Sequence, residues 1–170
     1  MAETEERDMT KRETYDYLTD HGVEYEVTEH IAVYNMEELN AVRLPYPDRD
    51  AKNLVGRDDK KRNYYLITVK GDKRVDLKEF RKAHGLRNLS FASADDLMSI
   101  MGLIPGAVTP LGLLNDEERK VTLYLDSAFC GGLIGVHPND NTATVWMQSE
   151  DLVKLLKDHG NIVNVVEIGA

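Results

Sequence analysis

The segment from Gly102 to Asp116, GLIPGAVTPLGLLND, constrains the fold most, because it holds three glycines, two prolines and no charge before its last residue. Pro105-Gly106 predicts a tight turn, and Pro110 predicts that regular structure stops a few residues later. Glycine permits close approach to the backbone, and proline stiffens the chain. We therefore expect residues 106–110 to form a stiff loop with exposed amides. Such a loop fits either a plain helix-to-strand connection or one wall of a binding site.

Hydrophobic periodicity predicts helices and strands on both sides of this loop. Helices are expected at residues 10–21 with Thr10 as the cap, after caps at Asn35 and Ser93, at 77–84 with Asp76 as the cap, and from a cap at Ser149 to His159. Strands are expected at residues 23–28, 52–57, 64–69, 89–92, 121–125, 133–136, 143–147 and 162–168. These elements alternate without a regular βαβ rhythm. The pattern predicts an α/β (α+β) fold with a mixed sheet or an open barrel surrounded by helices.

The chain of 170 residues is long enough for one domain with a sizeable core. We expect residues 1–170 to form a single domain, with residues 1–9 as a flexible N-terminus. No apolar run approaches the roughly 20 residues that span a bilayer, and the charged first residues do not resemble a secretory signal. The single cysteine, Cys130, excludes an internal disulfide and fits a reducing cytoplasm. We expect it to be a buried structural thiol.

Charge is distributed unevenly along the chain, whose net charge is −9. Residues 52–87 carry 12 basic and 5 acidic side chains, whereas residues 1–51 carry 5 basic and 14 acidic, and residues 88–170 carry 4 basic and 11 acidic. The overall acidity argues against indiscriminate nucleic-acid binding. A basic island within an acidic protein is either a site for a polyanion at one defined place or a solvated lysine-rich face.

The chain carries no motif for a conventional nucleophile or for a metal. There is no H-E-x-x-H and no cysteine pair, so we expect no metal, and there is no G-x-S-x-G, Walker or G-x-G-x-x-G motif. We expect no cofactor either. Three of the five histidines are expected at helix ends, where histidine contacts terminal carbonyls. His137 differs from these three, because it lies between a strand and a proline turn.

Seven short motifs follow one another in a recognisable order. They are Ala51-Lys52-Asn53-Leu54, Tyr64-Tyr65-Leu66, Asp76-Leu77-Lys78, Leu89-Ser90-Phe91-Ala92-Ser93, Pro105-Gly106-Ala107-Val108-Thr109-Pro110, Asn115-Asp116 and His137-Pro138-Asn139. This order resembles the YbaK-like prolyl-tRNA editing family over about residues 10–168, almost the whole chain. The resemblance is greatest to the freestanding alanyl-tRNA(Pro) deacylases, called PrdX or ProXp-ala. Each motif is weak alone, and seven in register make the resemblance specific.

The resemblance implies a trans-editing hydrolase, an aminoacyl-tRNA deacylase that cleaves alanine from mischarged proline tRNA. The implied fold is the mixed, barrel-like sheet of the editing domain associated with bacterial prolyl-tRNA synthetases. A synthetic site shaped for proline excludes the smaller alanine poorly, since one methylene discriminates by only about 1–3 kcal/mol. In an editing site water can attack the ester without a protein nucleophile, aided by backbone amides and by a ribose hydroxyl of the substrate. The implied partners are the tRNA(Pro) acceptor end and prolyl-tRNA synthetase, in the cytoplasm and without a membrane.

The resemblance also implies roles for nine residues. Catalytic roles fall to Lys52, near the 3′-terminal adenosine, to Gly106, in the loop that positions the ester, and to His137, at the aminoacyl pocket. Substrate-binding roles are implied for Asn53, Thr109, Pro110, Ile31, Val33 and Tyr34, of which the last three match the pocket wall. Many relatives have serine where Ala107 stands, so a hydroxyl role at that position does not carry over.

Two alternatives remain open. The YbaK branch shares the lysine and the G-x-x-x-P loop, so a cysteinyl-tRNA(Pro) deacylase fits the same motifs. A non-catalytic module that binds tRNA or the synthetase would keep the same fold. The first alternative differs in its preference among aminoacyl esters, and the second would bind tRNA without cleaving any ester.

Overall fold

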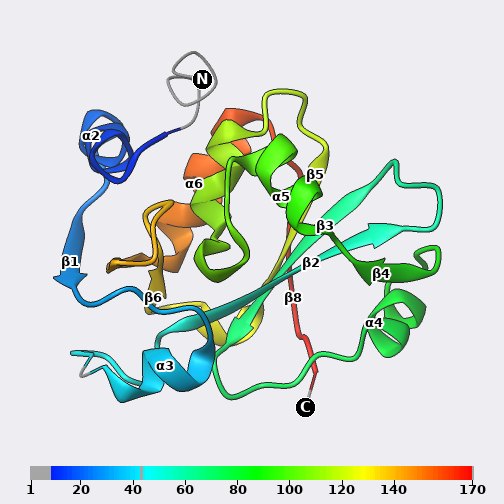
Figure 1. Cartoon of the computed structure of the whole chain (residues 1–170), viewed down its shortest axis with the longest axis horizontal. Helices are drawn as coiled ribbons and strands as arrows, with labels where there is room; N and C mark the ends of the chain where they lie inside the picture. Colours follow the sequence, from blue (N-terminus) through cyan, green and yellow to red (C-terminus); the bar gives the residue numbers. More distant parts are fainter. Residues whose placement is uncertain (1–8, 43, 170) are drawn as a thin grey trace.

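Two β-sheets and the helices around them make up the fold (Figure 1). The structure is a computed structural model that describes residues 9–42 and 44–169, so the N-terminus expected to be flexible lies outside it except for its last residue. The larger sheet has the strand order β4 (Leu89–Phe91), β2 (Ala51–Asp58), β3 (Tyr64–Lys70), β5 (Val121–Asp126), β8 (Val163–Val166). The smaller sheet has the order β1 (Tyr25–Glu29), β7 (Ala143–Gln148), β6 (Leu133–Val136).

The larger sheet is mixed. Strand β2 pairs antiparallel with β3 and β4, whereas the β3–β5 and β5–β8 pairs are parallel. The smaller sheet is antiparallel throughout. The two sheets meet where Asp50, just before β2, bridges to Gly135 of β6. The predicted mixed α/β fold with surrounding helices is confirmed, with the sheet divided into two parts.

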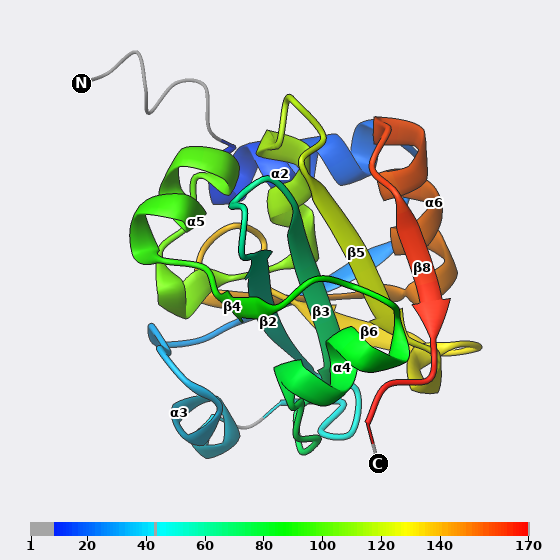
Figure 2. The ribbon, with the colours of Figure 1, turned by 90° about the vertical axis from the view of Figure 1, so that its right-hand side faces the viewer.

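Strand β3 is buried on both faces, which explains why its sequence, YYLITV, is apolar without alternation. Successive side chains of a strand point to opposite faces. Leu66 therefore joins the main core, whereas Ile67 joins a second cluster with Phe80 and Tyr124. Phe80 lies on α4 (Leu77–Ala83), which covers one face of the larger sheet (Figure 2). Helices α5 (Ala94–Met101) and α6 (Ser149–His159) contribute to the main core on the other face.

Four helices begin at the capping residues that the sequence predicts. Thr10 and Ser93 form capping boxes at α2 (Lys11–Asp20) and α5, and Asn35 and Asp76 cap α3 (Met36–Ala41) and α4. Each of these side chains accepts a hydrogen bond from a backbone N–H that the first turn would otherwise leave unpaired. Local sequence therefore fixes these four helix starts.

The prediction that Ser149 caps α6 is wrong. Gln148 occupies the N-cap, and Ser149 is the first helical residue. The Ser149 hydroxyl donates to the Phe129 carbonyl at 2.9 Å, which ties α6 to the 3-10 helix η3 (Ser127–Phe129). A tertiary partner for the hydroxyl has replaced the local cap.

The segment expected to be a loop of exposed amides is largely helical. It forms two 3-10 helices, η1 (Pro105–Ala107) and η2 (Pro110–Asn115). Pro110 begins a helix instead of ending regular structure, because the first helical position needs no N–H partner. Residues 110–114 are buried against α5 and α6, so this part of the segment belongs to the core.

Gly135 of β6 lies against Trp146 of β7, a side chain that is only 1% exposed. A Cβ added at Gly135 would lie closer than 3.0 Å to three atoms of the indole ring. We expect Gly135→Ala to lower the free energy of unfolding by about 1–3 kcal/mol, since overpacking a filled core forces side chains from their preferred conformations. Denaturant unfolding followed by tryptophan fluorescence measures the change.

Gly56→Ala is the matched control, because Gly56 is also a buried strand glycine. A Cβ at Gly56 would meet its nearest neighbour, Leu89, at 3.7 Å, an ordinary contact distance. Its unfolding free energy should stay within about 0.5 kcal/mol of the parent. Equal losses in the two variants would show that crowding at Trp146 is not the cause.

Candidate functional site

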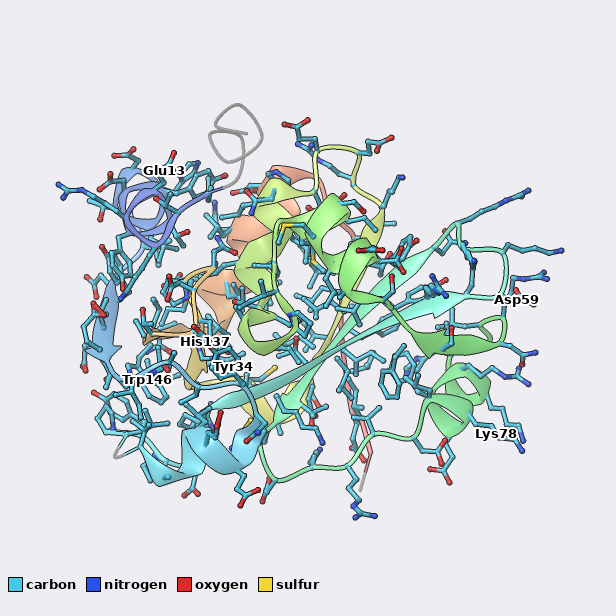
Figure 3. The ribbon with its side chains drawn as sticks, viewed as in Figure 1. Glu13, Tyr34, Asp59, Lys78, His137 and Trp146 are labelled. Atoms are coloured by element: carbon cyan, nitrogen blue, oxygen red, sulfur yellow. The ribbon has the colours of Figure 1, made fainter. Side chains whose placement is uncertain are left out.

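A cavity of about 200 Å³ opens where the first residues of β2 face the η1 turn and the segment before α3. Six of the nine residues selected from the sequence line it: Val33, Tyr34, Lys52, Asn53, Gly106 and His137. The remaining lining residues are Asn35, Met36, Leu39, Ala51, Leu54, Pro105 and Val108. Chain segments far apart in the sequence therefore converge on one small site, and the lining residues Tyr34 and His137 lie close together in Figure 3.

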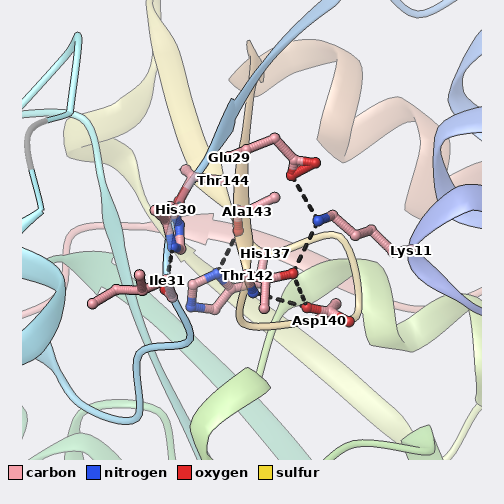
Figure 4. A network of polar contacts seen from close by, with 9 residues as sticks. All are labelled: Lys11, Glu29, His30, Ile31, His137, Asp140, Thr142, Ala143 and Thr144. Carbon is pink, nitrogen blue, oxygen red and sulfur yellow. Dashed lines mark hydrogen bonds and ion pairs between the residues drawn. The ribbon is translucent and has the colours of Figure 1, made fainter.

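Three of the selected residues lie outside the lining. The Ile31 side chain is 78% exposed and points away from the neighbouring polar network (Figure 4). Thr109 and Pro110 are buried behind the η1 turn. Thr109 still acts on the site, because its hydroxyl donates to the His137 carbonyl at 2.6 Å.

Hydrogen bonds between backbone and side chain hold the cavity walls together. Besides the Thr109 bond, the buried Asn141 amide donates to the Val33 carbonyl at 2.7 Å, and the Val33 N–H donates to the Asn141 carbonyl at 3.2 Å. Asn141 is not among the residues selected from the sequence. The run of Pro, Asn and Asp after His137 indicates a turn, but nothing local shows which side chain reaches back 108 residues along the chain.

The ring of His137 has a defined tautomer. Its Nδ1 lies 2.9 Å from the Ala143 carbonyl, which can only accept, so Nδ1 carries the proton. Burial lowers the pKa of His137 from its usual range, and His30 lowers it further, while the bond to Ala143 opposes both effects. At neutral pH the ring is therefore neutral. Its Nε2 presents a lone pair and has no hydrogen-bond partner within residues 9–42 and 44–169.

Figure 4 shows the polar network that surrounds this ring. His30 packs edge-on to His137 with ring centroids 6.1 Å apart, and the His30 Nδ1 lies 2.8 Å from the Ile31 carbonyl. Lys11 of α2 pairs with Glu29 at 2.6 Å and donates to the Thr142 hydroxyl at 2.9 Å. These contacts fasten α2 and β1 to the turn that follows His137.

Lys52 and Asn53 are oriented by neighbours from adjacent strands and turns. The Lys52 ammonium donates to the Lys73 carbonyl at 3.1 Å, and its other two N–H donors have no acceptor among residues 9–42 and 44–169. Lys73 is itself anchored, because its ammonium pairs with the buried Asp126 and donates to the Ile168 carbonyl. The Asn53 side-chain oxygen accepts from the Thr68 hydroxyl at 2.7 Å.

Among the described residues that line the cavity there is no serine, threonine or cysteine. The expectation that Cys130 is buried is wrong, because the residue is exposed just after η3 and does not line this cavity. Within the described residues, no three His, Cys, Asp or Glu side chains are grouped closely enough to hold a metal ion. Among the described helices, none combines the length and apolar character needed to cross a membrane.

Residues 30–155 match the family described as the aminoacyl-tRNA editing domain. The chain belongs to this family. It is 40% identical over 147 residues to the prolyl-tRNA editing protein ProX of Acetoanaerobium sticklandii, an alignment that covers 86% of this chain and 90% of that protein. It is 33% identical over 145 residues to prolyl-tRNA synthetase associated domain-containing protein 1 of Mus musculus, covering 82% and 85% respectively.

The fold agrees with this assignment to the editing family. A crystal structure of a candidate trans-editing enzyme for prolyl tRNA synthetase superposes with a TM-score of 0.67 at 21% identity. The superposition covers 94% of this chain and 97% of that one. The two-sheet arrangement described above is therefore the fold of the YbaK-like editing domains.

Gly106 is the point at which the η1 turn touches the opposite wall. An added Cβ would lie 2.8 Å from Cδ1 and 3.0 Å from Cα of Tyr34. The exposed ring can rotate away but the backbone cannot, so we expect Gly106→Ala to displace residues 33–34 and change the cavity's width. Amide chemical shifts of Val33 and Tyr34 in NMR spectra should move, with little loss of thermal stability.

The double variant Gly106→Ala/Tyr34→Ala is the matched comparison. It removes the contact with Cδ1 and keeps the contact with Cα. We expect the Val33 shift to persist in it, because the backbone clash remains. An unmoved Val33 amide in both variants would show that this wall tolerates a methyl group.

Proposed function

We propose that the protein is a trans-editing hydrolase that deacylates mischarged alanyl-tRNA(Pro). The observation that carries the proposal is the convergence of Lys52, Gly106 and His137 on one small cavity whose described lining includes no serine, threonine or cysteine. An aminoacyl ester is already activated, so held water suffices for its hydrolysis. A volume of about 200 Å³ is below the roughly 300–1,000 Å³ typical of sites for drug-sized ligands, which favours a small aminoacyl group.

Each residue has a role in the proposal that follows from its contacts. The two free N–H donors of Lys52 bind a phosphate of the 3′ end, and Asn53 lies beside it. The Gly106 N–H, which donates to no acceptor in the described part of the chain, stabilises the negative charge that develops on the ester carbonyl oxygen. The His137 Nε2 accepts a hydrogen bond from the attacking water, assisted by the ribose hydroxyl of the substrate.

The remaining selected residues shape and support the site in this proposal. Val33 and Tyr34 bound the space for the aminoacyl side chain, since both line the cavity. Thr109 and Pro110 act from behind, through the His137 carbonyl and the start of η2. The acceptor end of tRNA(Pro) is the proposed partner, and prolyl-tRNA synthetase is a second one suggested by the name of the mouse relative. We assign no role to the exposed Ile31 side chain within the cavity.

A deacylation assay tests the proposed function directly. The purified protein is given one tRNA(Pro) transcript charged in turn with alanine, cysteine, serine or proline. We expect alanyl-tRNA(Pro) to be cleaved fastest and prolyl-tRNA(Pro) to be spared, because an editing site must discriminate against the correctly charged product. Faster cleavage of the cysteinyl ester would favour the cysteinyl-tRNA(Pro) deacylase, and tight binding without any cleavage would favour the non-catalytic module.

His137→Asn tests the proposed role of Nε2. An asparagine amide can still donate to the Ala143 carbonyl, as Nδ1 does, but it places no acceptor where Nε2 lies. We expect deacylation to fall by about a hundredfold, in the range that positioned acid–base groups contribute. His137→Gln, whose side chain can place an oxygen near the Nε2 position, should retain more activity. Equal activities of these two variants would contradict the role of Nε2.

The pH dependence of the parent relative to His137→Asn provides a second measurement. Because the pKa of folded His137 is lowered, the neutral ring persists down through its unfolded value of about 6.5. The activity ratio should therefore stay flat from pH 8 to 6.5 and fall only at lower pH. Stability that depends on His137 should likewise be lost as the pH falls below 6.5, because the unfolded state then binds the proton more readily.

A further inference from the structure

The basic segment found in the sequence forms a defined surface at one end of the larger sheet. Its exposed cations are Lys60, Lys61 and Arg62 in the β2–β3 turn and Lys78 and Lys82 on α4. We call this surface the basic end. It lies at the opposite end of the sheet from the cavity, as the positions of Asp59 and Lys78 relative to Tyr34 and His137 show (Figure 3).

Two contacts hold the parts of the basic end side by side. Arg87, on the connection between α4 and β4, pairs with Asp59 of the β2–β3 turn at 2.6 Å. Strand β4 also pairs with the last residues of β2, with Leu89 opposite Asp58. Figure 1 places the turn, β4 and α4 on the same side of the molecule, and in Figure 2 this side faces the viewer, with the turn above β4 and α4 below it.

The cations of the basic end are not neutralised by neighbouring carboxylates. None of the five forms an ion pair with a carboxylate in residues 9–42 or 44–169. The nearby acids are mostly engaged: Asp58 accepts from backbone groups of the turn, Asp59 pairs with Arg87, and Asp76 caps α4. Glu79 on α4 is the exposed exception. Clustered cations that are not neutralised give a surface a positive potential even in a chain of net charge −9.

Strand β2 connects the basic end to the proposed site. Lys52 at its start lines the cavity, and Lys60 follows shortly after its last residue. A strand rises about 3.3 Å per residue, so the two lysines are separated by roughly 25 Å. A single nucleotide cannot cover that distance. A nucleic-acid stem can, because its phosphates recur at intervals of about 3.4 Å along the axis.

We propose that the basic end binds the phosphate backbone of the acceptor stem whose 3′ end occupies the cavity. This inference rests on the proposed function and extends it from the terminal nucleotide to the double-stranded part of the substrate. Exposed lysines and an arginine on a turn and a helix face suit phosphate contacts, which position a stem without reading its bases. The basic end therefore contributes affinity and orientation, while the cavity selects the aminoacyl group.

Two double variants test the surface, Lys60→Ala/Lys61→Ala on the turn and Lys78→Ala/Lys82→Ala on α4. The matched control is Lys154→Ala/Lys157→Ala, which removes two exposed cations from α6 instead. Each protein is assayed on full-length alanyl-tRNA(Pro) and on a 3′-alanylated CCA trinucleotide. Binding of uncharged tRNA(Pro) is measured in parallel by fluorescence anisotropy over a range of salt concentrations.

We expect the turn and α4 variants to raise KM for the full-length substrate several-fold and to leave cleavage of the trinucleotide unchanged. The slope of log affinity against log salt should become shallower by about 1.4–1.8 for each pair, since each lost phosphate contact changes it by about 0.7–0.9. The control should match the parent in all three measurements.

Other outcomes separate the failure of this inference from that of the proposed function. Unchanged tRNA affinity and salt slope in both variants, or an equal effect in the control, would overturn the role of the basic end. Equal loss on the trinucleotide would also overturn it, because the effect would then arise at the cavity. If the parent cleaves neither substrate but the variants still flatten the salt slope, the basic end stands as an RNA-binding surface and the proposed deacylation fails.

Discussion

The burial of β3 on both faces is the constraint on which the rest of the structure depends. A strand in that position needs cover above and below, which α4 provides on one side and α5, α6 and η2 provide on the other. It also needs a partner on each edge, β2 on one side and β5 on the other. The pairing with β3 fixes the register of β2, so that Lys52 lies opposite Val69 and faces the cavity.

The cavity depends on this frame but is assembled by hydrogen bonds from loops. The η1 turn, the residues before α3 and the turn after β6 carry few regular backbone pairings of their own. Thr109 and Asn141 connect them by donating to the carbonyls of His137 and Val33. Buried polar groups of this kind specify one arrangement, because each would leave an unsatisfied partner if the loops moved apart.

The sequence predicted local structure well where local chemistry decides it. Helix starts at Thr10, Asn35, Asp76 and Ser93 follow from side chains that cap the residues next to them. It failed where a distant partner decides, as at Ser149, whose hydroxyl binds Phe129, and in the run after Pro110, which is buried by α5 and α6. In the candidate site the family resemblance selected six lining residues, and the missed Asn141 makes a contact 108 residues away that no local pattern encodes.

The hydrogen bonds that hold the cavity walls together affect which substitutions the walls can accept during evolution. Val33 and His137 are both held through their peptide carbonyls, which every amino acid possesses. A hydrogen bond to a backbone carbonyl does not depend on the side chain of the residue that accepts it. The hydrogen bond to the Val33 carbonyl therefore survives a change of side chain, although the side chain itself, which is only 2% exposed, must still fit its buried surroundings. The same hydrogen-bonded framework is therefore suited to support cavities of different widths in diverged sequences.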